Sequence, residues 1–263
     1  MRPLMGSLPR EAGLPDTETL PSGGGRLSLG DFKLERVVFE VRYPHAVLFW
    51  DRAGALWNEA SRLWPGLNLM HAEPAKTAFR IGDEFHVAME LEATRLVSFW
   101  PEKGLERFQE MSKTLVELIS GVLEIKSFSR VGLRTFYFME FPDRDSATAA
   151  LISAGLTRVP PGRHFGTEGA PTSFECCYRW EVKAIGVRVW VGYQFREYKF
   201  EKPPEIKVPK LEKGLETLQY HGILFDIDFY TTAPVEVGQL GVHDWIQQHL
   251  HELRRDADSF LGG

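Results

Sequence analysis

Alternating apolar and polar residues predict β-strands in several parts of the chain. In residues 32–44, every second side chain from Val37 to Tyr43 is apolar, whereas the alternate positions include Glu40 and Arg42. A strand places successive side chains on opposite faces, so this strand has a core face and a polar face. The same pattern predicts a meander of short strands in 76–100, a hairpin in 173–195 that turns near 183–186, and a strand in 224–235.

Apolar residues at helical spacing predict amphipathic helices between these strands. The predicted helices cover residues 47–64, 104–122, 145–154 and 239–261, and Pro65 with Gly66 ends the first of them. Strands followed by helices in this order are typical of α+β proteins. We therefore expect a twisted antiparallel sheet with amphipathic helices, including 104–122 and 239–261, packed on one face.

The distribution of large apolar residues predicts the domain organisation. Residues 1–30 contain prolines, a run of three glycines and few large apolar side chains, so we expect a flexible N-terminal tail. Residues 31–263 read as a single α+β domain with possible sub-halves 31–142 and 143–263. We find no residue-level repeat between the halves.

Charged residues occur at alternate positions in three predicted strands. The candidate ligand-binding residues are Glu40, Arg42, Arg130, Arg134, Asp226 and Asp228. Three interpretations follow: a ladder of ion pairs on a solvated face, a polar cavity for an anionic or polar ligand, or a metal site with two carboxylates. Phe136 and Phe138 share the face of Arg130 and Arg134, so we expect both arginines to pair with these acids at the mouth of a pocket.

The predicted hairpin interleaves aromatic residues with arginines. Arg179, Arg188 and Arg196 lie among Tyr178, Trp180, Trp190, Tyr193, Phe195 and Tyr198. A peptide- or nucleic-acid-binding surface is one interpretation, because stacking on aromatic rings and neutralisation by arginines hold single strands of nucleic acid. Alternation favours the other interpretation, in which the aromatic rings pack in the core and the arginines lie outside.

Composition narrows the class of protein. With 31 basic and 36 acidic residues the net charge is −5, which argues against nucleic acid as a partner, because proteins that bind it usually carry a basic excess. Neither a signal peptide nor a membrane-spanning segment is predicted, so we expect a cytoplasmic protein. The adjacent Cys176 and Cys177 should point to opposite faces of a strand, which disfavours a disulfide.

Sequence motifs for cofactors and metals do not occur. The chain has no HExxH, no paired CxxC, no GxxxxGK[ST] loop and no GxSxG. We therefore predict neither a cofactor nor a bound metal.

Four segments resemble a sporadically distributed, uncharacterised bacterial family of about this length. They are "ERVVFEVRYP", "FSRVGLRTFYFMEF", "LFDIDFYTT" and a closing helix that ends in "SF", within residues 33–261. The resemblance implies a bacterial origin and a shared architecture, and it brings no activity or site residue with it.

Two hypotheses of function follow. We expect a non-enzymatic binding or regulatory protein for a small polar ligand, a peptide or a protein partner, and make no prediction of the oligomeric state. The alternative is a metal-dependent hydrolase or phosphotransfer enzyme centred on Asp226 and Asp228. Convergence of these carboxylates with a third acid in a concave site favours the enzyme, whereas pairing with arginines on an open face favours a scaffold.

Overall fold

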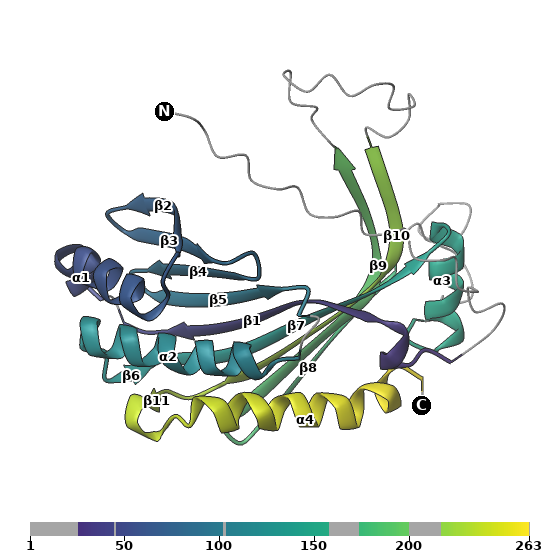
Figure 1. Cartoon of the computed structure of the whole chain (residues 1–263). Helices are drawn as coiled ribbons and strands as arrows, with labels where there is room; N and C mark the ends of the chain where they lie inside the picture. The colour runs from purple at the N-terminus through teal and green to yellow at the C-terminus, as the bar shows by residue number, and fades with distance from the viewer. Residues whose placement is uncertain (1–25, 45, 102–103, 158–173, 200–216, 263) are drawn as a thin grey trace, which may run out of the picture.

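The chain folds around one large antiparallel sheet. The computed structural model describes residues 26–44, 46–101, 104–157, 174–199 and 217–262. Within them, nine strands pair in the order β2-β3-β4-β5-β1-β7-β10-β9-β8, and β6 pairs separately with β11 (Figure 1). The strands are β1 Lys33–Arg42, β2 Asn68–Glu73, β3 Lys76–Ile81, β4 Phe85–Glu90, β5 Ala93–Phe99, β6 Ser127–Phe128, β7 Arg130–Phe141, β8 Glu175–Val182, β9 Ile185–Lys199, β10 Thr217–Thr231 and β11 Val235–Glu236.

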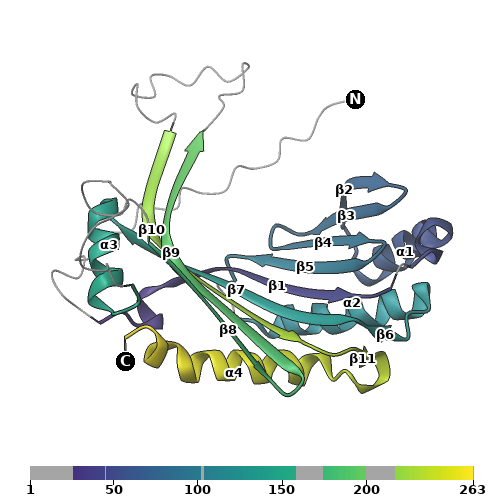
Figure 2. The same cartoon turned by 180° about the vertical axis from the view of Figure 1, so that it is seen from behind.

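The helices lie against this sheet and confirm the predicted α+β fold. They are α1 Leu48–Leu63, α2 Glu106–Leu123, α3 Arg144–Ser153 and α4 Val242–Phe260. In Figures 1 and 2, α2 and α4 run side by side along the strands, with α1 next to α2 and α3 at the other end of the sheet. None of the described helices is both long enough and apolar enough to cross a bilayer.

The strand β7 shows how the sequence divides the sheet into two faces. Val131 and Leu133 are fully buried among residues of the helices. Arg130 and Arg134 occupy the alternate positions and therefore project from the opposite side. The neighbouring strands have the same two faces, because residues directly opposite each other in paired strands point to the same side of the sheet. We call the side that no described helix covers the open face.

Two apolar clusters fill the helix-covered face, and α4 belongs to both. Ile246 and Leu250 pack with residues of α1, α2 and β1. Leu253 and Ala257, one turn further on, pack with residues of α3, β9 and β10. The predicted sub-halves 31–142 and 143–263 therefore share one helix, and the pairing of β7 with β10 joins them in one sheet.

The sequence prediction misses β2 and underestimates β9 and β10. Strand β2, Asn68–Glu73, lies at the sheet edge with only His71 partly buried, so it has no apolar alternation to reveal it. Strand β10 begins at Thr217, seven residues before the predicted start at 224. Its first residues include the exposed Gln219, and a strand with little burial lacks the pattern that marks its end.

Residues 27–30, at the end of the predicted flexible tail, pack against the domain. Leu27 is 4% exposed and packs with Phe32 in the second cluster. Ser28 caps a short 3-10 turn, Leu29–Asp31, and the backbone N–H of Leu29 donates to the Asp258 carboxylate on α4 at 2.6 Å. One apolar anchor and a capped turn hold this segment, and residues 1–25 lie outside the described residues.

The predicted core position is wrong for four of the hairpin aromatics: Phe195 and Tyr198 are 45% and 46% exposed, and Tyr178 and Trp180 are exposed as well. Tyr178 and Trp180 are 42% and 45% exposed. They stack on each other on β8, and the edge of Phe260 is their contact with α4. Because β8 is the last strand of the sheet, the helices cover it incompletely. Arg179 and Arg188 lie on the open face, away from these rings.

We expect Ile246→Ala to lower the free energy of unfolding by about 2 to 5 kcal/mol, because truncating a buried aliphatic side chain leaves a cavity. Ile246 is 0% exposed, and the neighbouring Gln247 is exposed. Gln247→Ala should change stability by less than about 0.5 kcal/mol. Urea denaturation of both variants measures the difference, and equal effects would contradict the packing of α4 described above.

Candidate functional site

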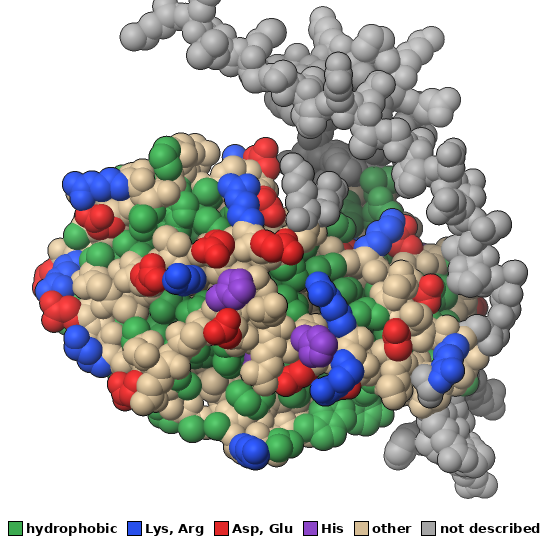
Figure 3. Space-filling model, turned by 60° about the horizontal axis from the view of Figure 1, so that its bottom comes forward, with side chains coloured by type: hydrophobic (Ala, Val, Ile, Leu, Met, Phe, Trp, Pro, Cys, Tyr) green, Lys and Arg blue, Asp and Glu red, His purple; other side chains and the backbone are tan. Residues whose placement is uncertain are grey.

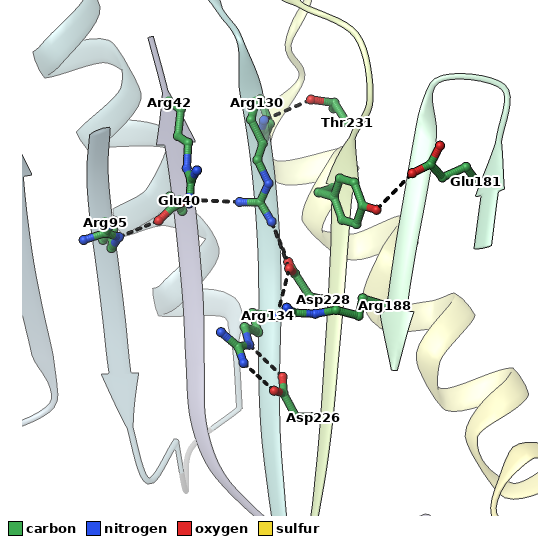
Figure 4. A network of polar contacts seen from close by, with 12 residues as sticks. Glu40, Arg42, Arg95, Arg130, Arg134, Glu181, Arg188, Asp226, Asp228 and Thr231 are labelled. Carbon is green, nitrogen blue, oxygen red and sulfur yellow. Dashed lines mark hydrogen bonds and ion pairs between the residues drawn. The ribbon is translucent and has the colours of Figure 1, made fainter. Parts of the chain in front are cut away.

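Charged side chains from five neighbouring strands meet on the open face. The members of this charge network are Arg95 on β5, Glu40 and Arg42 on β1, Arg130 and Arg134 on β7, Asp226 and Asp228 on β10, and Arg188 on β9. Figure 4 shows that ion pairs run from β5 across β1 and β7 to β10. Alternation within each strand places these residues on one side, and strand order brings them together.

Glu40 is the acceptor for three arginines. Its Oε1 accepts hydrogen bonds from Arg42 Nε at 2.6 Å and Arg130 Nη1 at 2.8 Å, and its Oε2 accepts one from Arg95 Nε. The Glu40 side chain is only 11% exposed. Burial by itself raises the pKa of the Glu40 carboxyl, but the hydrogen bonds from Arg95 and Arg42 outweigh it and hold the pKa below its usual value.

Arg130 links Glu40 to Asp228. Its Nη2 donates to both carboxylate oxygens of Asp228 at 2.9 Å. The residue directly opposite Asp228 is Arg134, so the Arg130 side chain reaches it by crossing Gly132. A Cβ at Gly132 would stand 2.6 Å from Arg130 Nη1. Because Gly132 has no Cβ, the Arg130 guanidinium has room to pass over it, and glycines often occur in strands where another group approaches closely.

Arg134 forms the second aspartate pair. Its Nε lies 2.7 Å from Asp226 Oδ1, and its Nη2 donates to Oδ2, which is the fork geometry of strong arginine–carboxylate pairs. The Asp226 side chain is only 6% exposed. The Arg134 guanidinium also lies over the ring of Phe136, 4.6 Å from its centroid, and Arg36 lies over the same ring at 3.8 Å.

Asp228 differs from Glu40 in its protonation behaviour. Burial raises the pKa of the Asp228 carboxyl above its usual value, although Arg130, Arg188 and Arg134 favour its charged form. Arg188 Nη2 lies 3.6 Å from Asp228 Oδ2, which is an ion pair but too long for a hydrogen bond.

The open face is hollowed above the charge network. The cavity has a volume of about 700 Å³, which falls within the range of small-molecule sites. Its lining combines seven arginines with three carboxylates and an apolar strip that includes Val38, Val97 and Phe99. Both signs of charge are interspersed on the helix-covered side (Figure 3). The hollow therefore concentrates positive charge in a protein whose net charge is −5.

The structure brings the six predicted candidates together. Glu40, Arg42, Arg130, Arg134, Asp226 and Asp228 all belong to the charge network. The predicted pairing of Arg130 and Arg134 with these acids is present, and ligand binding by the six residues stays a prediction.

Four further arginines of the site are not among the candidates predicted from the sequence. Arg36 and Arg95 carry no distinguishing pattern, and Arg179 and Arg188 belong to the predicted aromatic hairpin. All four line the cavity together with Glu40, Arg42, Arg130, Arg134 and Asp228, whereas Asp226 does not line it. Alternation assigns each of them to a face of its own strand, whereas only the strand order shows that these faces coincide.

The aspartates of the enzyme hypothesis are both engaged by arginines. Asp226 is held by Arg134, and Asp228 by Arg130. Among the residues that the structure describes, no group of three or more His, Cys, Asp or Glu side chains is placed to hold a metal ion. Of the two arrangements distinguished above, the structure has the pairing of both aspartates with arginines.

Comparisons with known proteins assign no family. No protein-family model matches the sequence, and no curated protein matches it. Among solved structures, one similar chain is described as "DynU16 crystal structure, a putative protein in the dynemicin biosynthetic locus"; the identity is 10% and the TM-score 0.22, covering 88% of this chain and 96% of that chain. A likeness of this degree supports no argument about function.

We expect Glu40→Gln to lower the free energy of unfolding at pH 7 by about 2 to 3 kcal/mol, because three arginines lose their shared carboxylate. The value is modest because Arg42 and Arg95 stay partly hydrated. The folded-state pKa of Glu40 lies below its usual 4.5, so the carboxylate contributes stability that is present above pH 4.5 and is lost as the pH falls through the folded-state pKa.

The difference in stability between wild type and Glu40→Gln should therefore shrink below pH 4.5. Urea denaturation from pH 7 to pH 3 measures it. Glu59→Gln is the control, because Glu59 forms an exposed pair with Arg62 on α1. A difference that is constant over this range would contradict the hydrogen-bonding of Glu40 described here.

Arg130→Met should lower the free energy of unfolding by about 3 kcal/mol, because it leaves the mostly buried carboxylates of Glu40 and Asp228 with one partner fewer. Asp228→Asn should cost less, because the raised pKa of Asp228 shows that the fold favours its neutral form. Double-mutant denaturation should give a coupling energy above about 1 kcal/mol. Arg134→Met combined with Asp228→Asn should couple less, because the fork of Arg134 is occupied by Asp226. Stronger coupling to Arg134 would show that Asp228 pairs with its direct cross-strand neighbour instead.

Proposed function

We propose that this protein is a non-enzymatic binding or regulatory protein whose open face holds a small anionic ligand. The observation that carries the proposal is the hollow of about 700 Å³ lined by seven arginines and three carboxylates. Guanidinium groups bind carboxylates and phosphates through charge-assisted, often bidentate hydrogen bonds. The surplus of positive charge is local, because the whole chain is acidic.

The buried acids support the proposal by fixing several arginines in advance. Glu40 holds Arg42, Arg95 and Arg130, and Asp226 holds Arg134. An arginine that is already ordered loses less conformational entropy when a ligand arrives. The carboxylates therefore act as supports for the cationic surface while leaving it positive overall.

The other hypotheses receive less support from this geometry. An acidic peptide could lie on an open face, but the size of the hollow favours a small ligand. A metal-dependent hydrolase or phosphotransfer enzyme needs Asp226 and Asp228 as metal ligands, and their arginine forks occupy the same oxygens. A cation would have to displace these arginines in a surface that is already positive.

We place the protein in the cytoplasm as part of this proposal. Cys176 and Cys177 are both free. They face opposite sides of β8, as adjacent residues of a strand must, so they cannot pair with each other. Free thiols support a reducing compartment.

Isothermal titration calorimetry with inorganic phosphate at constant ionic strength tests the proposal. We expect saturable binding that Arg36→Gln weakens about tenfold, equivalent to the loss of one charge-assisted hydrogen bond. Arg36 lines the hollow and forms no ion pair with a described acid, so the substitution breaks none. Arg62→Gln, on α1 and away from the hollow, is the matched control and should leave binding unchanged.

Absence of saturable binding, or equal losses in the two variants, would overturn the proposal. Native mass spectrometry of the protein as purified is a second test, because it measures the mass of any bound ligand or metal. A bound small anion would agree with the proposal. A bound divalent metal that Asp226→Asn removes would support the enzyme hypothesis instead.

A further inference from the structure

Two pairs of arginines on the open face are incompletely compensated, and they lie on either side of β10. The first pair is Arg36 on β1 with Arg134 on β7, and the second is Arg188 on β9 with Arg179 on β8. All four line the hollow. Asp228 of β10 lies between the pairs, directly opposite both Arg134 and Arg188.

The first pair concentrates two guanidinium groups on one aromatic ring. Arg36 and Arg134 lie 3.8 and 4.6 Å from the centroid of Phe136. Arg134 uses Nε and Nη2 for Asp226, and its Nη1 makes no hydrogen bond to a described residue. Arg36 forms no ion pair with a described acid, and burial together with the charge of Arg134 lowers its pKa. An anion placed between the two guanidinium groups would relieve this repulsion.

The second pair places like charges directly opposite each other. Arg179 and Arg188 are cross-strand partners in the antiparallel pairing of β8 with β9, and like charges at such positions are destabilising. Arg188 lies 3.6 Å from Asp228 Oδ2, but both oxygens of that carboxylate already accept hydrogen bonds from Arg130. Arg179 has no hydrogen bond or ion pair to a described residue. This pair therefore offers a second position for an anion.

The spacing of the strands sets the separation of the two positions. The midpoint between β1 and β7 and the midpoint between β9 and β8 are three strand spacings apart, or roughly 14 Å across the strands. Arg36 lies over Phe136 of β7, and Arg188 reaches toward Asp228 of β10, so the guanidinium groups of these two arginines are closer together than their strands are. The carboxylate of Asp228 between them disfavours negative charge in the middle of a ligand and can accept hydrogen bonds from hydroxyl groups.

We propose that the ligand of the open face is an organic bisphosphate, with its two phosphates at opposite ends of a short polyhydroxylated chain. This inference rests on the proposed function and names the ligand class. A phosphate carries between one and two negative charges and three acceptor oxygens, which suits two guanidinium groups. A carboxylate carries a single charge, so it would leave one positive charge of such a pair uncompensated. The neutral middle of such a ligand meets Asp228.

Calorimetric titration of the full chain at constant ionic strength tests this inference. The probes are a hexose 1,6-bisphosphate, the matched hexose 6-phosphate, tripolyphosphate, and a linear dicarboxylate of similar length. We expect the bisphosphate to bind at least about 100-fold more tightly than the monophosphate, because the second phosphate binds at a high effective concentration. Tripolyphosphate, which carries charge in its middle, should lose most of this advantage.

The double variant Arg179→Gln/Arg188→Gln should remove the advantage of the bisphosphate. Its affinity should fall to that of the monophosphate, while the affinity of the monophosphate changes by only about twofold, because the first pair remains. Arg36→Gln should weaken both ligands about tenfold, as it weakens inorganic phosphate, because the first position is the one that the monophosphate occupies. Arg62→Gln is the matched control. The unliganded double variant should unfold at no lower temperature than wild type, because it removes a like-charge pair.

Other results separate the two proposals. If phosphates bind and Arg36→Gln weakens them, but the monophosphate and bisphosphate bind equally, the proposed function stands and the two-position ligand is wrong. Tighter binding of tripolyphosphate or of the dicarboxylate would also overturn the bisphosphate class. If no probe binds, or if open-face variants have no more effect than Arg62→Gln, both proposals fail.

Discussion

The ion-pair chain Glu40–Arg130–Asp228 is the interaction on which the open face depends. Its two carboxylates are almost withdrawn from water, and such groups are tolerated only with close compensation. Arg130 compensates both from the strand between them, so the chain ties β1, β7 and β10 together on the face that no described helix covers. The remaining arginines of the network are positioned around these carboxylates and around Asp226.

The strand β7 connects this polar surface to the apolar core. Its alternate residues Val131 and Leu133 are fully buried, so the backbone that carries Arg130 and Arg134 is fixed by packing. Its two edges pair with β1 from one sub-half and β10 from the other. A rigid core strand therefore supports the charge network, and this is the arrangement in which side chains can be held ready for a ligand.

The sequence predicts the faces of the strands better than it predicts the contacts across them. Alternation was sufficient to group Arg130 with Arg134 and Asp226 with Asp228, because each group lies on a single strand. It could not show that Arg130 passes over Gly132 to reach Asp228, since this depends on register and on side-chain direction. It also could not place Arg95 or Arg179 in the site, because their strands join it through long-range pairing.

The open face carries more arginines than are needed to compensate its buried aspartates. A sheet that only needed to compensate Asp226 and Asp228 would be complete with Arg134 and Arg130, and Arg179 opposite Arg188 adds a repulsion that neutral side chains would avoid. Arg36 beside Arg134 adds another. Residues whose interactions disfavour folding are expected at surfaces that serve binding. The proposal of an anionic ligand therefore rests on the excess cations of the open face rather than on its ion pairs.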